Sequence, residues 1–172
     1  DGLERLIRGL LPYSHEKAAL LVFDRFKNKM RWWFGSQLML GFIVGVLVTL
    51  GLWLLGVPYY FVIGLLAFVF ELVPIIGPIL VGLAAFLVAV SDSFTLGMYT
   101  VLFFFLVQQL ENHVLVPLVM GRVLKLNPVM VIVSLLAGAQ VAGFIGLILA
   151  MPAAVLAQEF FNYIAERKGQ RP

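Results

Sequence analysis

The sequence contains no cysteine, which excludes disulfides, thiolate metal sites and cysteine nucleophiles. It also lacks the HExxH, GxSxG, Walker and GxGxxG patterns of metalloproteases, serine hydrolases, nucleotide-binding loops and dinucleotide folds. The sequence therefore offers no recognisable set of catalytic residues. We predict that the chain is not an enzyme and needs no cofactor or bound metal.

Charge is also scarce. Only 12% of the residues are charged while 62% are hydrophobic, and the mean hydropathy is +1.04. Soluble domains carry about twice that share of charge, so we predict an all-α integral membrane protein. The net charge of +3 comes from Lys and Arg near the ends of apolar runs, which suits lipid headgroups and not nucleic acid. Because the chain starts at Asp1 without Met or a signal region, we expect further spans before it.

Residues 1–33 predict amphipathic helices that lie in the interface or the cytoplasm. The first helix has apolar side chains at helical spacing: Leu3, Leu6, Ile7, Leu10 and Leu11. Ser14 can cap a second helix, in which an apolar stripe from Ala19 to Trp33 opposes basic residues between Arg25 and Arg31. An ordinary soluble helix pair is the alternative.

Residues 34–165 predict a transmembrane domain, followed by a basic tail at 166–172. After Trp32 and Trp33, which mark the headgroup level, 34–55 is long enough to cross about 30 Å of hydrocarbon. Within it, Gly41 and Gly45 form a GxxxG pattern that permits close helix packing. A second full span is expected at 94–120.

Two other apolar segments, 60–90 and 129–160, are interrupted. The breaks are Pro74, Gly77 and Pro78 in the first segment and Gly138, Gly143 and Gly146 in the second. Each arm of the first segment reaches only about 20 Å, too short to cross alone. Such a segment is either one long kinked span or a re-entrant hairpin.

The positive-inside rule favours hairpins. With two full spans and two hairpins that enter from opposite faces, the N-terminal basic region, Arg122, Lys125 and the C-terminal basic tail all fall in the cytoplasm. A full crossing at 60–90 would move Arg122 and Lys125 outside. Inverted pairs of broken helices with a site near the midplane are used by secondary transporters.

Glu71 is the only charged residue between Phe34 and Val90. It directly precedes the first break, where freed backbone groups need partners or line a wet cavity. A desolvated acid there can bind a cation or carry a proton. The alternative is a structural role as a partner of the freed amides.

A second polar cluster lies in QQLENH, residues 108–113. Gln108, Glu111 and Asn112 share a helix face, which can line a pathway together with Gln109. The alternative is that these side chains only meet water at the cytoplasmic end. His113 alone is too little to indicate a metal ligand or a proton switch. In the second hairpin, Gln140 is the sole amide between Gly138 and Gly143 and is expected to form hydrogen bonds at the tip.

The stretches GVPYYFVIGLLAFVFELVPIIGPILVG and QQLENHVLVPLVMGRVLKLNPVMVIVSLLAGAQVAGFIGLILAMPAAVL resemble the autoinducer-2 exporter family of bacterial and archaeal membrane proteins. The likeness runs from about Trp33 to Phe160, and the chain is similar to the C-terminal half of a member. The resemblance implies export of small solutes, among them the quorum-sensing signal autoinducer-2, across the cell (inner) membrane. It also implies assembly as a homo-oligomer, and some members are described as sodium/proton antiporters.

We therefore expect a secondary transporter that exports a small solute, driven by an ion gradient. A sodium/proton antiporter and a non-transporting membrane scaffold are the alternatives. The expected transport and coupling residues are Glu71, Glu111, Gln108, Gln109, Asn112 and Gln140. We favour the proton over sodium at Glu71, because its neighbours Leu72, Val73 and Ile75 offer no side-chain oxygen.

Overall fold

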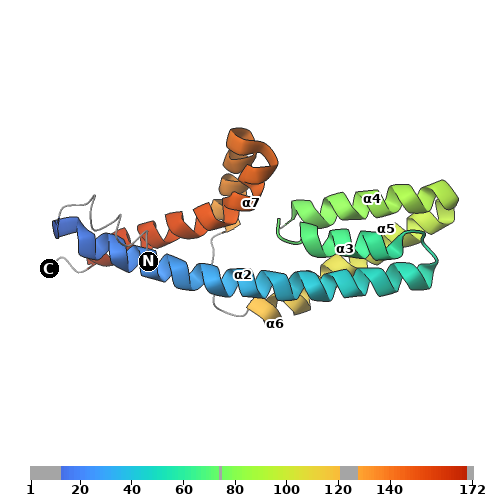
Figure 1. The fold of residues 1–172 in the computed structure, drawn as a ribbon, viewed down its shortest axis with the longest axis horizontal. Helices are drawn as coiled ribbons and strands as arrows, with labels where there is room; N and C mark the ends of the chain where they lie inside the picture. Colours follow the sequence, from blue (N-terminus) through green and yellow to red (C-terminus); the bar gives the residue numbers. More distant parts are fainter. Residues whose placement is uncertain (1–12, 74, 121–127, 170–172) are drawn as a thin grey trace. The chain divides into compact units, whose positions relative to one another are not determined.

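The structure is a computed structural model that describes residues 13–73, 75–120 and 128–169. These residues are helical and contain no strand, as predicted (Figure 1). The elements are α2 (Tyr13–Leu55), α3 (Tyr60–Phe70), α4 (Ile76–Asp92), α5 (Phe94–Leu110), the π-helical segment η1 (Glu111–Leu115), α6 (Val116–Met120) and α7 (Pro128–Gly169). The predicted first amphipathic helix, together with Pro74, Arg122, Lys125 and the end of the basic tail, lies outside the described residues.

Three helical stretches are long and apolar enough to cross a membrane: Leu20–Leu55, Phe94–Val119 and Val129–Glu166. The apolar helices Tyr60–Phe70 and Ile76–Asp92 are shorter. These lengths are those of a multi-pass membrane protein. The predicted boundary at residue 33 does not interrupt the helix, because α2 is continuous from Tyr13, and Ser14 lies inside it instead of capping it.

The chain divides into two compact units, which are described separately. Unit 1 comprises residues 1–32 and 124–172, and unit 2 comprises residues 33–123. Unit 2 therefore contains the second half of α2 together with α3, α4, α5, η1 and α6.

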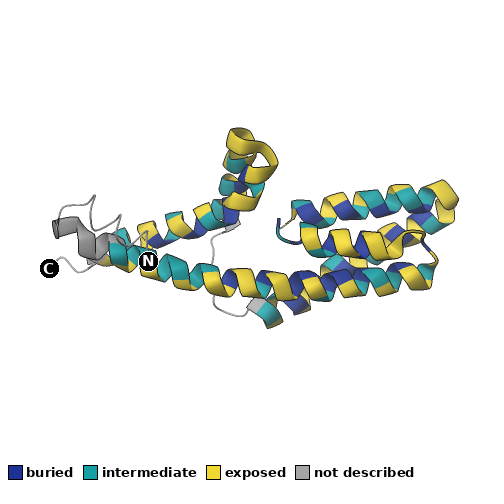
Figure 2. Cartoon of the chain, in the orientation of Figure 1, coloured by how far each residue is buried: buried dark blue, intermediate teal, exposed yellow. Residues whose placement is uncertain are grey.

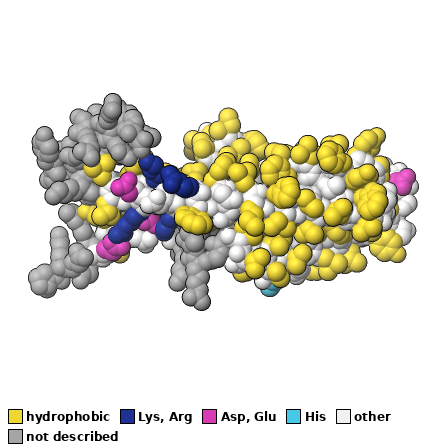
Figure 3. All heavy atoms as spheres, turned by 60° about the horizontal axis from the view of Figure 1, so that its bottom comes forward, with side chains coloured by type: hydrophobic (Ala, Val, Ile, Leu, Met, Phe, Trp, Pro, Cys, Tyr) yellow, Lys and Arg dark blue, Asp and Glu magenta, His cyan; other side chains and the backbone are white. Residues whose placement is uncertain are grey.

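The core of unit 2 forms around one stripe of α2. Leu40, Val44, Val48 and Leu52 recur every four residues and are buried, which is the spacing of a single helix face (Figure 2). They pack in one cluster with apolar residues of α3 and α4: Ile63, Ala67, Val81, Ala85 and Ala89. The outer surface is also hydrophobic, as the visible face in Figure 3 shows. An apolar exterior is stable in hydrocarbon and would be an aggregation risk in water.

Close packing of α2 on α3 depends on small residues. A Cβ on Gly45 would lie 3.0 Å from the Gly64 carbonyl oxygen, and one on Gly41 would lie 2.9 Å from that of Phe68. The GxxxG pattern of α2 therefore faces another helix, as its spacing predicted. This contact lets the end of α3 approach the α2 backbone.

The first broken segment is a helical hairpin and not one kinked helix. The antiparallel helices α3 and α4 lie side by side (Figure 1). The break falls between Phe70 and Ile76, so Gly77 and Pro78, which were predicted to lie in the break, are in the first turn of α4. Proline is tolerated there because the first helical N–H groups have no intrahelical partner.

In unit 1, α7 also folds back on itself. Its backbone leaves the helical region at Ala142 (φ −138°, ψ 18°) and Gly143 (φ 56°, ψ −131°). A Cβ on Gly146 would lie 1.8 Å from the Gly138 carbonyl oxygen, whereas residues eight apart in a straight helix are about 12 Å apart. Gly143 therefore makes the turn, while Gly138 and Gly146 permit the two arms to touch.

Ion pairs join the first half of α2 to the last part of α7. Arg25 Nη1 donates to both Glu166 carboxylate oxygens at 2.9 and 3.1 Å. Lys29 Nζ pairs with Glu159, whose side chain is buried. Part of the basic stripe predicted for Arg25 to Arg31 thus holds unit 1 together.

Candidate functional site: a buried carboxyl pair

Glu71 stands at the C-terminal end of α3. It is only 3% exposed, and its own backbone N–H still donates to the Ala67 carbonyl. The carbonyl end of a helix is the negative end of its dipole, which disfavours a second negative charge. The fold therefore holds an acid where a proton or a cation is favoured over a bare carboxylate.

Glu111 begins the π-helical segment between α5 and α6. The Val116 N–H donates to the Glu111 carbonyl, five residues earlier instead of four. Pro117 follows directly, and it lacks the N–H that an α-helix would direct at the His113 carbonyl. The widened turn accommodates the proline and leaves the Glu111 side chain 7% exposed.

The side chains of Glu71 and Glu111 line one cavity together with Gln108, and both glutamates are buried. Two ionised carboxylates in one largely apolar cavity would repel each other, so the site favours a proton or a cation between them. From α2, the side-chain amide of Gln37 donates to the backbone carbonyl of Glu71. Three segments that are distant in sequence thus meet at the end of α3.

A small cavity of about 10 Å³ lies beside the pair. Its polar lining is Glu71, Gln108 and Glu111, and the apolar lining includes Val44, Ala67, Val81, Phe104 and Val107. This volume is near the minimum for one water molecule. The space is thus suited to a proton, a water or one small ion, and an organic solute does not fit in this conformation.

A larger groove of about 400 Å³ lies elsewhere, between α2 and α3. It is lined by Phe42, Val46, Leu50, Phe61, Leu65 and Phe68, together with two glycines and Thr49. The Thr49 hydroxyl already donates to the Gly45 carbonyl. A hydrophobic outward groove suits hydrocarbon contact, so we place the candidate site at the carboxyl pair.

The sequence matches the family model described as AI-2E family transporter over residues 1–166. The chain belongs to this family.

Curated relatives support the same membership. "Putative transport protein YrrI" of Bacillus subtilis is 31% identical over 166 residues, which are 96% of this chain and 47% of that protein. "Putative transport protein sll0063" of Synechocystis is 31% identical over 98% of this chain and 42% of its own length. The chain thus spans about half the length of these relatives. Membership in a family of transporters confirms the prediction that the chain is not an enzyme.

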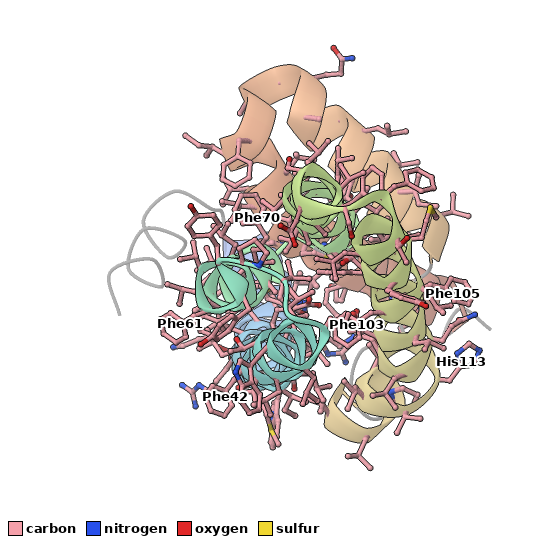
Figure 4. The ribbon with its side chains drawn as sticks, turned by 90° about the vertical axis from the view of Figure 1, so that its right-hand side faces the viewer. Phe42, Phe61, Phe70, Phe103, Phe105 and His113 are labelled. Carbon is pink, nitrogen blue, oxygen red and sulfur yellow. The ribbon has the colours of Figure 1, made fainter. Side chains whose placement is uncertain are left out.

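In this AI-2E family chain, the polar residues of 108–112 do not form one common face as predicted. Along an α-helix, Glu111 lies about 60° to one side of Gln108 and Asn112 about 40° to the other. Gln108 and Glu111 line the cavity, whereas Asn112 and Gln109 are exposed. His113 is exposed too, and its Nδ1 lies 2.9 Å from the Gln109 carbonyl (Figure 4). Gln140 is exposed in the α7 hairpin of unit 1.

Gln37 was not among the predicted site residues. This residue is 2% exposed and is a buried amide in a span otherwise dominated by apolar residues, which was a detectable signal. Its contact with the end of α3 makes it part of the site.

Proposed function

We propose that the intact protein is a secondary transporter that exports a small solute and uses Glu71 and Glu111 as its proton-binding site. The observation that carries this proposal is that two buried glutamates from different elements line one small cavity. Ionisable residues within membrane segments are costly and typically functional. A scaffold that only packs helices has no need of this pair.

The carboxyl pair is suited to holding one proton. Both groups are buried and line one small cavity, so we expect the pair to share a single proton instead of carrying two negative charges. Release of that proton leaves two carboxylates in an apolar setting, where like charges repel strongly. This repulsion would separate the α3–α4 tip from η1, which links proton release to movement of the hairpin.

Sodium/proton exchange is the second function that the geometry favours. Two deprotonated carboxylates offer the hard oxygen ligands that a sodium ion prefers, and the cavity between them is of single-ion size. A cation would then replace the shared proton and hold the two elements together in its absence.

The proposal includes a membrane arrangement. Phe34–Leu55 and Phe94–Met120 are taken as full spans, and the α3–α4 and α7 hairpins as re-entrant elements that enter from opposite faces, with both basic ends in the cytoplasm. Broken helices and the charge pattern support this arrangement. Assembly as a homo-oligomer, which the family resemblance implies, belongs to the same proposal.

Flux in proteoliposomes of the intact protein tests the coupling site. Vesicles are loaded with autoinducer-2, and efflux is followed with and without a pH gradient or a sodium gradient. We expect Glu71→Gln, which keeps the shape but cannot titrate, to assemble normally and to lose the response to the pH gradient. Asp92→Asn, an exposed acid at the end of α4, is the matched control and should retain it. Unchanged pH and sodium dependence in Glu71→Gln would show that the pair is structural.

A further inference from the structure

Two buried polar atoms on α2 lack a partner. Among the described residues, Trp33 Nε1 and Gln37 Oε1 are the buried side-chain nitrogen and oxygen atoms without a hydrogen bond. Their residues are 4% and 2% exposed. An unsatisfied buried polar group is costly, so native structures normally supply a partner or an ordered water.

The two atoms are complementary and close in sequence. Indole Nε1–H only donates, and an amide oxygen only accepts. Residues four apart on a helix have Cβ atoms about 5–6 Å apart, a separation that one small group can bridge.

The neighbouring contacts fix the orientation of the Gln37 amide. Its Nε2 donates to the Glu71 carbonyl, and a carbonyl oxygen can only accept, so Oε1 must face away from that carbonyl. The unpaired oxygen is therefore a consequence of the contact with Glu71.

We propose that Trp33 and Gln37 bind a hydroxyl group, which accepts from Trp33 Nε1–H and donates to Gln37 Oε1. Water and the hydroxyl of a small polyol share this chemistry. The Gln37 amide then connects the bound hydroxyl to the backbone carbonyl of Glu71. The hydroxyl marks the side from which water reaches the carboxyl pair. At the other end of unit 2, Leu52, Ala85 and Ala89 are fully buried and apolar, so that end is closed to water. The role in proton access rests on the proposed function, whereas the binding of a hydroxyl does not.

Tryptophan NMR of the intact protein in nanodiscs tests the site. The indole ¹⁵N–H signal of Trp33 is assigned by its loss in Trp33→Phe, and its cross-peaks to water and to added glycerol are measured. A cross-peak to water identifies bound water, and cross-peaks to the glycerol CH protons identify a polyol hydroxyl. We expect the cross-peak to be lost in Gln37→Met and retained in Asn162→Leu, an exposed amide on α7. A Trp33 signal with neither cross-peak in the wild-type protein would overturn the proposal, even if Gln37→Met fails to fold.

The function of the site is tested by proton flux in the same vesicles as above. Gln37→Met should slow the response to the pH gradient, while Glu71→Gln should abolish it. A normal rate in Gln37→Met would overturn the access role. If Glu71→Gln is unaffected while the Trp33 cross-peak is present, the proposed coupling function fails and the hydroxyl site stands.

Discussion

At the residue scale, the glycines at the two turns meet different physical demands. Gly143 has φ 56° and ψ −131°, a region closed to L side chains, although a Cβ there would meet nothing within 4 Å. Gly77 lies within α4, and a Cβ there would lie 1.9 Å from the Phe70 carbonyl oxygen. One position requires a backbone conformation, and the other requires space.

Gly77→Ala is therefore expected to destabilise the protein by roughly 1–3 kcal/mol, because the added methyl displaces a backbone atom and not a flexible side chain. Gly35→Ala is the matched control, since its Cβ would meet nothing within 4 Å and alanine favours a helix. Thermal unfolding of the intact protein in detergent compares the two. Equal unfolding temperatures would contradict the close approach at Gly77.

Some residues of the site were predictable from sequence and others were not. Glu71 and Glu111 stand out because acids are rare in apolar segments. Ile75 adopts φ 71° and ψ −56°, which is rare for a β-branched residue. Nothing in the sequence marked it, because a turn rich in proline and glycine is expected to place positive φ on glycine. Which acid meets Glu71 depends on tertiary packing, which sequence spacing does not record.

At the element scale, apolar runs predicted the helices well, and the turns less well. The π-helical segment was not visible, because apolar periodicity over five residues does not distinguish π from α hydrogen bonding. The segment nevertheless begins at the site residue Glu111 and ends two residues before Pro117, which indicates a role in orienting Glu111. Such segments are frequent at functional sites, since they change the direction of a side chain.

Replacing Pro117 by Ala tests this role. The alanine restores an N–H and removes the ring clash, so the turn can close as an ordinary α-helix, and stability should rise by up to about 3 kcal/mol. The same closure would turn Glu111 away from Glu71 and weaken the response of transport to pH. Thermal unfolding and proteoliposome flux measure the two effects. Raised stability with unchanged pH response would show that the π turn does not position Glu111.

At the scale of the whole molecule, composition was enough to predict the all-helical membrane class. Spacing was not enough to predict that Lys29 and Arg25 pair with α7, because an amphipathic pattern shows only that one face is polar and not what it contacts. The sidedness of the loops remains a prediction. Charge bias during insertion determines it, and helix packing alone does not.

Cysteine labelling decides that sidedness, and these 172 residues contribute no native cysteine to the background. Single cysteines replace Ser91, exposed at the end of α4, and Gly121, beside Arg122 and outside the described residues. In intact cells, an impermeant thiol reagent should label position 91 and should reach position 121 only after permeabilisation. The reason is that Arg122 and Lys125 favour the cytoplasm, whereas Ser91 to Ser93 carry no basic residue. Labelling of position 121 from outside would mean that the α3–α4 segment crosses the membrane, and it would refute the re-entrant arrangement together with the opposite entry of the two hairpins.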